Sequence, residues 1–155
     1  MTITATDSEA RRIANGERVE VWVPMADAPD GVEAFNEEED VNGELFFVLC
    51  GPLEGRLRKI LGSVIPPFLP GAVVGVRERW ASKCGDICEE HLACIRYEAG
   101  YDFMDGTFRW EPAETMPDWA IRSHPVCVSC VPAIRDSDGK WWWKVQVQKG
   151  APNEG

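Results

Sequence analysis

The sequence lacks the features that mark membrane, exported and repetitive proteins. No apolar run approaches the roughly 18 residues that a membrane span needs, and the N-terminal MTITATDSEARR contains no apolar signal core. We find no internal repeat and no low-complexity segment. We therefore expect a globular protein that stays in the cytoplasm, and disulfides are disfavoured there.

Histidine is scarce, since His91 and His124 are the only two. Neither lies at a spacing from a serine or cysteine that is typical of a nucleophilic site. The sequence therefore argues against a hydrolase triad.

Basic residues are outnumbered, with 16 Lys and Arg against 26 Asp and Glu and a formal net charge of −10. A field of that sign repels phosphate backbones and disfavours non-specific binding to nucleic acid. It permits a pocket that reads one base, and it suits a protein that mimics nucleic acid or binds a basic partner. Plain solubility is the simplest explanation of the charge.

The length of 155 residues, with 45% hydrophobic and 27% charged residues, predicts one soluble domain over residues 1–150 and a disordered tail over 151–155. We expect a short helix at 8–16 with Ser8 as N-cap, and one helical turn that places Arg56 and Lys59 on one face. Strands are expected at 17–24, 45–50, 71–80, 126–131 and 141–148.

The segment 27–44 contains eight acidic residues and no Lys or Arg, which predicts a solvated acidic loop. In the last strand, alternation points Trp142 outward among polar residues, where it could be a hot spot for a partner protein. The candidate partner-binding residues are Glu37, Glu38, Glu39, Asp40 and Trp142.

Alternation in the strand 71–80 places Glu78 on the same face as Val74, Val76 and Trp80. A carboxylate on an apolar face is costly unless it is paired. It could work as an acid or base, or it could form a buried ion pair with an arginine such as Arg122, which we favour.

The segment 108–122, FRWEPAETMPDWAIR, contains three aromatic residues and two prolines. Pro112 and Pro117 forbid a long helix, so we expect an irregular loop. Its tryptophans could close one end of a core or form part of a binding site.

Three stretches, PGAVVGVRERWA, IRYEAG and FRWEPAETMPDWAIR, resemble the ASCH domain proteins of tailed bacteriophages and prophages. The likeness covers about residues 70–147. It implies an α+β, mainly β fold, a small PUA-like β-barrel with short flanking helices. It also implies binding of RNA or a modified nucleotide or base in a cleft beside the barrel.

One branch similar to this family hydrolyses acetylcytidine with a lysine, a threonine and a glutamate, the first two within a Gly-x-Lys-x-x-Thr motif. In this chain the nearest stretch is 16–21, where Arg18 replaces the lysine and Val21 the threonine. Arginine cannot serve as a general base, so catalysis is disfavoured, and Glu78 is the only catalytic candidate. Arg18 could still hold a phosphate or a carboxylate.

The resemblance implies a ligand cleft in which tryptophans stack on a base while arginine and glutamate read its polar edge. For each tryptophan, a place in the core is the competing interpretation. The candidate ligand-binding residues are Arg18, Arg77, Glu78, Trp80, Tyr97, Trp110, Trp119 and Arg122.

The segment 81–95 is a cysteine-rich insertion in which Cys84, Cys88, His91 and Cys94 could hold a zinc ion. On a helix, Cys84, Cys88 and His91 would share one face, as ordinary core residues do, and we favour this interpretation over zinc. Zinc is the one cofactor that the sequence leaves open.

Three functions are therefore open: a module that binds RNA or a modified nucleotide, an acidic inhibitor of a host defence system of anti-CRISPR or anti-restriction type, and an acetylcytidine-type amidohydrolase or a nuclease. The aromatic residues with Arg and Glu favour the first, and the acidic segment with Trp142 favours the second. The missing lysine and threonine weaken the third.

Overall fold

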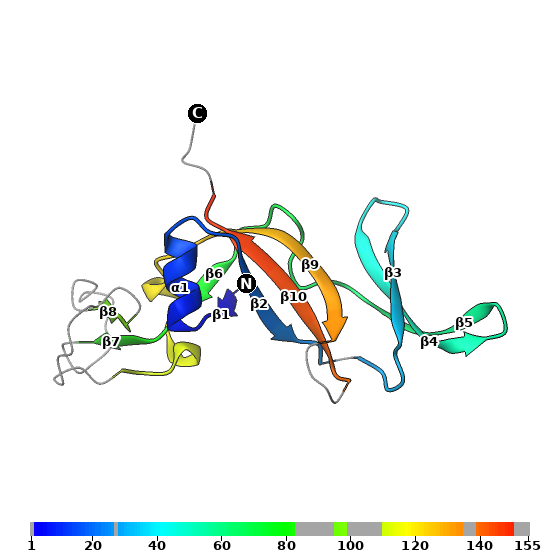
Figure 1. The fold of residues 1–155 in the computed structure, drawn as a ribbon. Helices are drawn as coiled ribbons and strands as arrows, with labels where there is room; N and C mark the ends of the chain where they lie inside the picture. Colours follow the sequence, from blue (N-terminus) through cyan, green and yellow to red (C-terminus); the bar gives the residue numbers. More distant parts are fainter. Residues whose placement is uncertain (1, 27, 83–94, 99–109, 135–138, 151–155) are drawn as a thin grey trace. The chain divides into compact units, whose positions relative to one another are not determined.

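The computed structural model describes residues 2–26, 28–82, 95–98, 110–134 and 139–150. These residues are mainly β with one α-helix, as predicted (Figure 1). The elements in chain order are β1 (Thr2–Thr4), α1 (Asp7–Ala14), β2 (Val19–Pro24), β3 (Ala34–Glu39), β4 (Leu45–Glu54), β5 (Leu57–Val64), β6 (Gly75–Arg77), β7 (Trp80–Ser82), β8 (Ile95–Tyr97), the 3-10 helices η3 (Ala113–Thr115) and η4 (Asp118–Ala120), β9 (Val126–Ile134) and β10 (Trp141–Gln148).

The described strands form four sheets, with the strand orders β1-β6, β2-β10-β9, β3-β4-β5 and β7-β8. None of these sheets closes into a barrel. The expected small β-barrel is therefore not formed by the described strands. Among the described residues, no helix is both long enough and apolar enough to cross a membrane.

The chain divides into two compact units. Unit 1 comprises residues 1–21, 71–128 and 146–155, and unit 2 comprises residues 22–70 and 129–145. The strands β2, β9 and β10 each begin in one unit and end in the other. Each unit is thus assembled from segments that lie far apart in the sequence.

In unit 1, α1 is capped at its start by Thr6, one turn ahead of its buried residues. The Thr6 backbone N–H donates to Glu9 Oε1 at 2.9 Å, and the Glu9 N–H donates to Thr6 Oγ1 at 3.2 Å. This reciprocal pair is a capping box, and it makes Thr6 the N-cap in place of the expected Ser8. Ala10 and Ile13 are the buried residues of the helix.

The strands β1 and β6 pair in parallel, with Thr2 opposite Gly75. A β-carbon added at Gly75 would lie 3.2 Å from Thr2 Cγ2 and 3.3 Å from Ile121 Cδ1. Such distances are tighter than ordinary van der Waals contact. Glycine at this position therefore allows the close packing of β1, β6 and the segment after η4.

The expected strand 71–80 is interrupted, because β6 ends at Arg77 and β7 starts at Trp80. Its predicted alternation is nevertheless confirmed, since Val74, Val76, Glu78 and Trp80 are all buried. Backbone hydrogen bonds from Val74 to the Pro125 carbonyl and from Val76 to the Ser123 carbonyl accompany the burial of this face.

The described part of the loop, residues 110–122, forms only the single turns η3 and η4, so the prediction of an irregular segment without a long helix is confirmed there. Pro112 and Pro117 are the N-caps of these turns. The turns contribute to a buried cluster of Trp80, Met116 and Ala120, against which Tyr97, Trp119 and Ile121 pack.

Unit 2 is built on aromatic contacts between its sheet and the start of β10. The ring centroid of Phe47 lies 5.7 Å from both Phe35 and Trp143, and Phe35 lies 6.0 Å from Trp141. Trp141 Nε1 also donates to the Val32 carbonyl at 3.0 Å. These contacts explain why an aromatic run belongs in β10, a strand whose bounds agree with the prediction.

The acidic segment 27–44 is only partly the loop that was predicted. Its centre is strand β3, which pairs antiparallel with β4, and a turn follows in which Asp40 Oδ1 accepts from the backbone of Asn42 and Glu44. The prediction was wrong here because the hydrophobic β4 supplies a pairing partner that composition does not reveal.

The segment that contains Arg56, Arg58 and Lys59 forms a turn and a strand, and not the expected helical turn. Gly55, at φ 68°, forms a tight turn that places Leu57 opposite Glu54. The chain therefore returns along β4 as β5, with Arg56 in the turn and Lys59 in the strand. The glycine at positive φ is the local signal for a hairpin.

Candidate ligand-binding site

Glu78 forms the buried ion pair with Arg122 that the sequence suggested. Glu78 is 1% exposed, and Arg122 Nη2 and Nε lie 2.9 and 3.2 Å from its two carboxylate oxygens. Both carboxylate oxygens of Glu78 thus contact one guanidinium. Because this pair satisfies the buried charge, Glu78 holds the chain after η4 onto the strand segment and is not free for a ligand.

Tyr97 completes this arrangement. The Arg122 Cζ atom lies 4.1 Å from the centroid of the Tyr97 ring, and the Tyr97 hydroxyl donates to the Ala120 carbonyl at 2.6 Å. Burial raises the pKa of Tyr97 above its ordinary value of 10.0, although Arg122 lowers it and Glu78 raises it. The phenol therefore keeps its proton and its hydrogen bond at neutral pH.

Two further predicted ligand residues also have structural partners. Trp80 is 1% exposed and donates from Nε1 to Thr115 Oγ1 at 3.2 Å. Arg77 donates to Thr2 Oγ1 at 3.2 Å and forms an ion pair with Asp118. Trp80 thus connects β7 to the segment 112–120, and Arg77 connects β6 to both β1 and that segment.

Trp119 and Arg18 do not join the others at one site. Trp119 is half-buried and packs against the core cluster. Arg18 is exposed and makes no hydrogen bond or ion pair with any residue that the structure describes. Of the predicted ligand residues, Glu78 and Trp80 are fully buried, and Tyr97 and Trp119 pack against the core cluster. Arg122 lines a pocket together with His124 and Lys149, and Trp110 lies beside a separate opening.

That opening is a pocket of about 520 Å³ in unit 1, beside the first turn of α1. Its volume is within the range of small-ligand sites. It combines one aromatic face, one guanidinium, two carboxylates and two hydroxyls. The lining residues are Thr4, Ala5, Thr6, Asp7, Arg79, Trp110, Pro112, Ala113 and Glu114.

A backbone bridge positions the aromatic and basic members of this pocket. Glu111 donates to the Trp80 carbonyl at 2.7 Å, and Trp80 donates to the Glu111 carbonyl at 3.4 Å. Arg79 precedes one side of the bridge and Trp110 precedes the other. The core residue Trp80 thus fixes the backbone from which both lining side chains extend.

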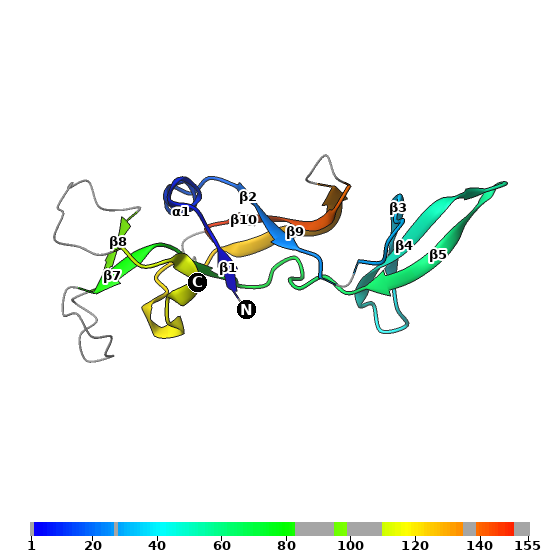
Figure 2. The same cartoon turned by 90° about the horizontal axis from the view of Figure 1, so that it is seen from below.

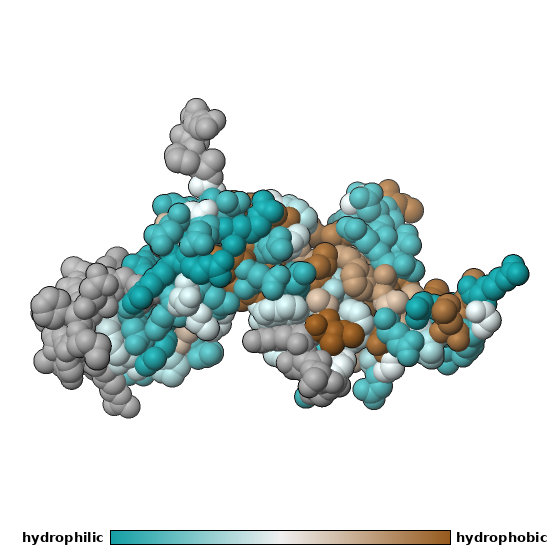
Figure 3. Space-filling view, in the orientation of Figure 1, coloured by the Kyte–Doolittle hydropathy of each residue, from teal (hydrophilic) through white to brown (hydrophobic). Residues whose placement is uncertain are grey.

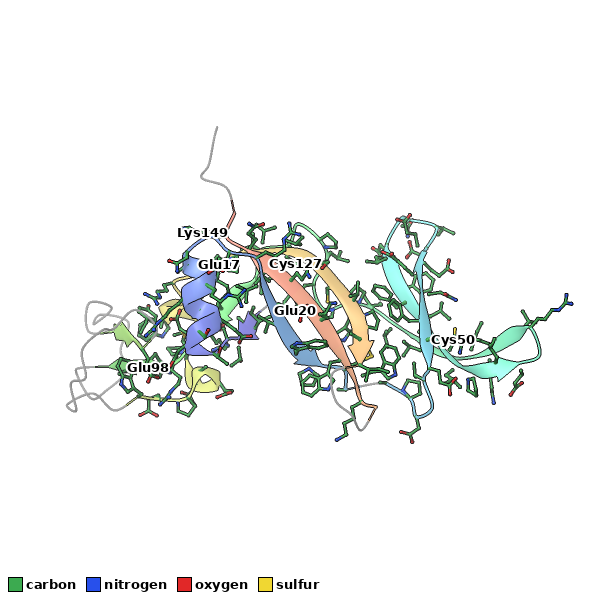
Figure 4. The ribbon with its side chains drawn as sticks, viewed as in Figure 1. Glu17, Glu20, Cys50, Glu98, Cys127 and Lys149 are labelled. Atoms are coloured by element: carbon green, nitrogen blue, oxygen red, sulfur yellow. The ribbon has the colours of Figure 1, made fainter. Side chains whose placement is uncertain are left out.

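A further carboxyl group, that of Glu98, lies next to Asp7 at the edge of the pocket. Arg79 Nε lies 2.9 Å from Glu98 Oε2, but its N–H is not aligned for a hydrogen bond. Asp7 Oδ1 and Glu98 Oε2 are buried atoms without a hydrogen-bond partner. Glu98 lies near the N-terminal end of α1 (Figure 4). Two carboxyl groups and one arginine therefore meet beside the pocket.

Burial raises the pKa of Glu98 above its ordinary value of 4.5, and the charge of Asp7 raises it further. Arg79 lowers the pKa, a hydrogen bond with Asp7 raises it, and Arg11 lowers it slightly, but the net direction is upward. The folded protein therefore holds the Glu98 proton more tightly than the unfolded chain does.

Because the folded-state pKa is raised, the contribution of Glu98 to stability is present at low pH and is lost as pH rises from about 4.5 through the folded-state value. We expect Glu98→Gln, which cannot ionise, to unfold at a higher temperature than wild type at neutral pH. The difference should shrink as the pH falls to 4. Thermal unfolding followed by circular dichroism across this range measures it.

Glu114→Gln is the matched control, because Glu114 is exposed and lines the same pocket. Glu114→Gln should change the unfolding temperature only slightly, and the change should be the same at every pH. A Glu98→Gln protein that is less stable than wild type at neutral pH would show that the Arg79 ion pair outweighs burial.

Asp7, Glu98 and Glu114 were not identified as candidate site residues from the sequence. Asp7 and Glu98 are far apart in the sequence and become neighbours only through packing of α1 against the β7–β8 region. For Arg79 a signal existed, since alternation placed it on the face opposite Glu78.

The residues suggested for a protein partner are in unit 2. Glu37, Glu38 and Glu39 are exposed on β3, and Asp40 is exposed in the following turn. Trp142 differs from its prediction, because it is half-buried and lines a second pocket of about 580 Å³ together with Pro24, Met25 and Trp141. Trp142 therefore borders the segment 28–32, which lines the same pocket.

The proposed zinc ligands Cys84, Cys88, His91 and Cys94 lie outside the described residues. Within the described ranges, no group of three or more His, Cys, Asp or Glu side chains is arranged to hold a metal ion. Cys127 is a buried free thiol, and burial raises its pKa. It is therefore suited to the core and not to nucleophilic chemistry.

No protein-family model, curated protein or solved structure matches this chain. The proposed function therefore rests on the residues of the chain itself.

Proposed function

We propose that unit 1 is a binding module for a single nucleobase, presented as a free or modified nucleoside, and that the pocket beside α1 holds it. The observation that carries the proposal is the combination, around one space of about 520 Å³, of Trp110, Arg79 and Asp7. An aromatic face offers stacking to any base, and fixed donors and acceptors read its edge.

The polar groups favour a base that carries an amino group. Asp7 lines the pocket with a carboxyl group that accepts hydrogen bonds, and its Oδ1 is buried without a hydrogen-bond partner. Arg79 donates, and Thr6 and Thr4 add hydroxyls. Cytosine, adenine and guanine each present an amino donor beside an acceptor, which matches a carboxylate next to a guanidinium.

The charge of the protein favours a nucleoside over a nucleic-acid strand. The net charge is −10, and Asp7 and Glu114 add negative charge at the pocket itself. Phosphates would be repelled, whereas an uncharged base with donor groups would not. Tight binding of a longer RNA would therefore contradict this form of the proposal.

The relationship to the ASCH domains and to their PUA-like fold is part of the same proposal. It is supported by the motif residues 70–80 and 110–122, which supply Arg79 and Trp110 of the pocket, and by the mainly β structure. The described sheets do not form the closed barrel of that class. The proposed relationship is therefore tested by measuring nucleoside binding and not by comparing folds.

We expect isothermal titration of the purified protein with nucleosides and acetylcytidine to reveal one binding site per chain. Trp110→Ala should weaken that binding roughly 5- to 150-fold, because stacking a base on an aromatic ring contributes about 1–3 kcal/mol. Arg79→Gln should change which base is preferred more than it changes the overall affinity.

Trp142→Ala is the matched control, since Trp142 is a half-buried tryptophan of unit 2. It should bind the ligand as wild type does. The proposal fails if no nucleoside binds the wild-type protein, or if Trp110→Ala and Trp142→Ala have the same affinity.

A further inference from the structure

The sheet β3-β4-β5 of unit 2 has two edges of opposite charge. Among the described strands, β3 and β5 each pair only with β4, so each leaves one edge without a strand partner. β3 carries Glu37, Glu38 and Glu39, whereas β5 and the turn before it carry Arg56, Arg58 and Lys59. One small sheet therefore presents an acidic edge and a basic edge.

The hairpin formed by β4 and β5 also exposes large apolar side chains. Leu53 is 60% exposed, Leu57 78% and Ile60 69%. Hydrophobic residues lie at the surface of this hairpin between hydrophilic ones (Figure 3), and the second view shows the hairpin as a two-stranded ribbon (Figure 2). A ribbon of two strands with exposed apolar side chains gains stability when another strand covers its edge.

We infer that the occupant of this edge is a second copy of this chain, whose β3 edge pairs with the β5 edge of the first. Pairing of β5 with another β5 brings basic clusters together, and pairing of β3 with another β3 brings glutamates together. Only the β5-to-β3 contact joins opposite charges. The charges thus select this pairing and disfavour the two symmetric ones.

Such a contact is heterologous, because the two surfaces that meet are different. After pairing, one copy keeps its β3 edge free and the other keeps its β5 edge free, so association continues into a ring or a longer assembly. Backbone hydrogen bonds supply the affinity, and burial of Leu57 and Ile60 adds to it. Both edges lie within unit 2, so the inference does not depend on the nucleoside pocket of unit 1.

Sedimentation velocity on the full chain across a concentration series tests the inference. Wild type should show a mass that rises with concentration. Arg56→Glu with Lys59→Glu should raise the apparent dissociation constant about tenfold or more, because attraction across the paired edges becomes repulsion. Arg58 is left intact because it donates to the Gly51 carbonyl at 3.1 Å and supports the hairpin.

Glu37→Lys with Glu38→Lys should weaken association in the same way. An equimolar mixture of the two doubly substituted proteins should regain it, since each reversed edge then meets a reversed partner and each original edge meets an original one. Arg12→Glu with Lys149→Glu is the control for Arg56→Glu with Lys59→Glu, because it lowers the net charge by the same amount but in unit 1. It should associate like wild type.

Hydrogen exchange of the wild-type protein provides a readout without substitutions. Backbone amides of β3 and β5 should gain protection as concentration rises, and those of β1 and β6 should not. The inference is overturned if wild type stays monomeric at every concentration, if both reversed proteins associate like wild type, or if their mixture does not regain association.

Discussion

Arg122→Ala is expected to destabilise unit 1 by about 3 kcal/mol, at the lower end of the range for breaking a buried ion pair. The reason is that the carboxyl group of Glu78, 1% exposed, would be left in the interior without its guanidinium partner. The Arg122 side chain is 40% exposed, which places the loss at the lower end. Urea unfolding followed by circular dichroism measures the change in the free energy of unfolding.

The ion pair predicts an asymmetry between its two partners. Glu78→Gln should cost less than Arg122→Ala, because an unpaired Arg122 can reach solvent while an unpaired Glu78 cannot. The double substitution should be more stable than Arg122→Ala alone, since no buried charge remains. If Arg122→Ala were as stable as wild type, the pair would have no structural role and Glu78 would return as a ligand candidate.

Arg12→Ala provides the comparison. Arg12 and Glu17 form an ion pair at 3.4 Å, and both side chains are about half exposed. Water screens such a pair, so the substitution should cost less than about 1 kcal/mol. The contrast between the two arginines separates the effect of burial from the effect of ion pairing itself.

Trp80→Ala is expected to destabilise unit 1 by about 3–5 kcal/mol, the usual cost of removing a buried tryptophan. Trp80 packs with Met116 and Ala120 and bridges the backbone of Glu111. Its loss would leave a cavity next to Met116 and Ala120, and relaxation of the segment 110–120 into this cavity would displace Trp110, although the backbone bridge to Glu111 is retained. The same unfolding experiment should therefore reveal a loss of stability, and titration should reveal weaker nucleoside binding.

Trp80→Phe separates packing from hydrogen bonding. The phenyl ring keeps most of the buried contacts but cannot donate to Thr115 Oγ1, so a cost of about 1 kcal/mol from the lost hydrogen bond is expected, with a further loss for the smaller ring. A Trp80→Ala protein that retained wild-type stability would contradict the assignment of this residue to the core.

The local sequence pattern predicted the structure correctly where the pattern lies within a single strand. Alternation in the segment 71–80 correctly placed Val74, Val76, Glu78 and Trp80 on the buried face, and the aromatic strand 141–148 has the expected bounds. It failed where the partner lies elsewhere in the chain. The glutamates of β3 were predicted to lie in a loop, because the strand β4 that pairs with them is not part of their local sequence.

The candidate site shows the same division. Trp110 could be selected from its loop and Glu78 from its face, yet their roles were decided by what packs against them. Glu78 meets Arg122, 44 residues away, and becomes structural. Asp7 lines the pocket and Glu98 lies at its edge, although no spacing in the sequence connects them.

The sequence by itself determined the mainly β fold, the excess of negative charge and the buried position of Glu78, because these follow from composition and from the period of two along a strand. Only the tertiary structure decided that Trp110 lines the pocket of unit 1, that Asp7 and Glu98 meet beside this pocket, and that β3 and β5 form opposite edges of one sheet. Those outcomes depend on contacts between distant segments, and the free energy of such contacts is not encoded in any local pattern.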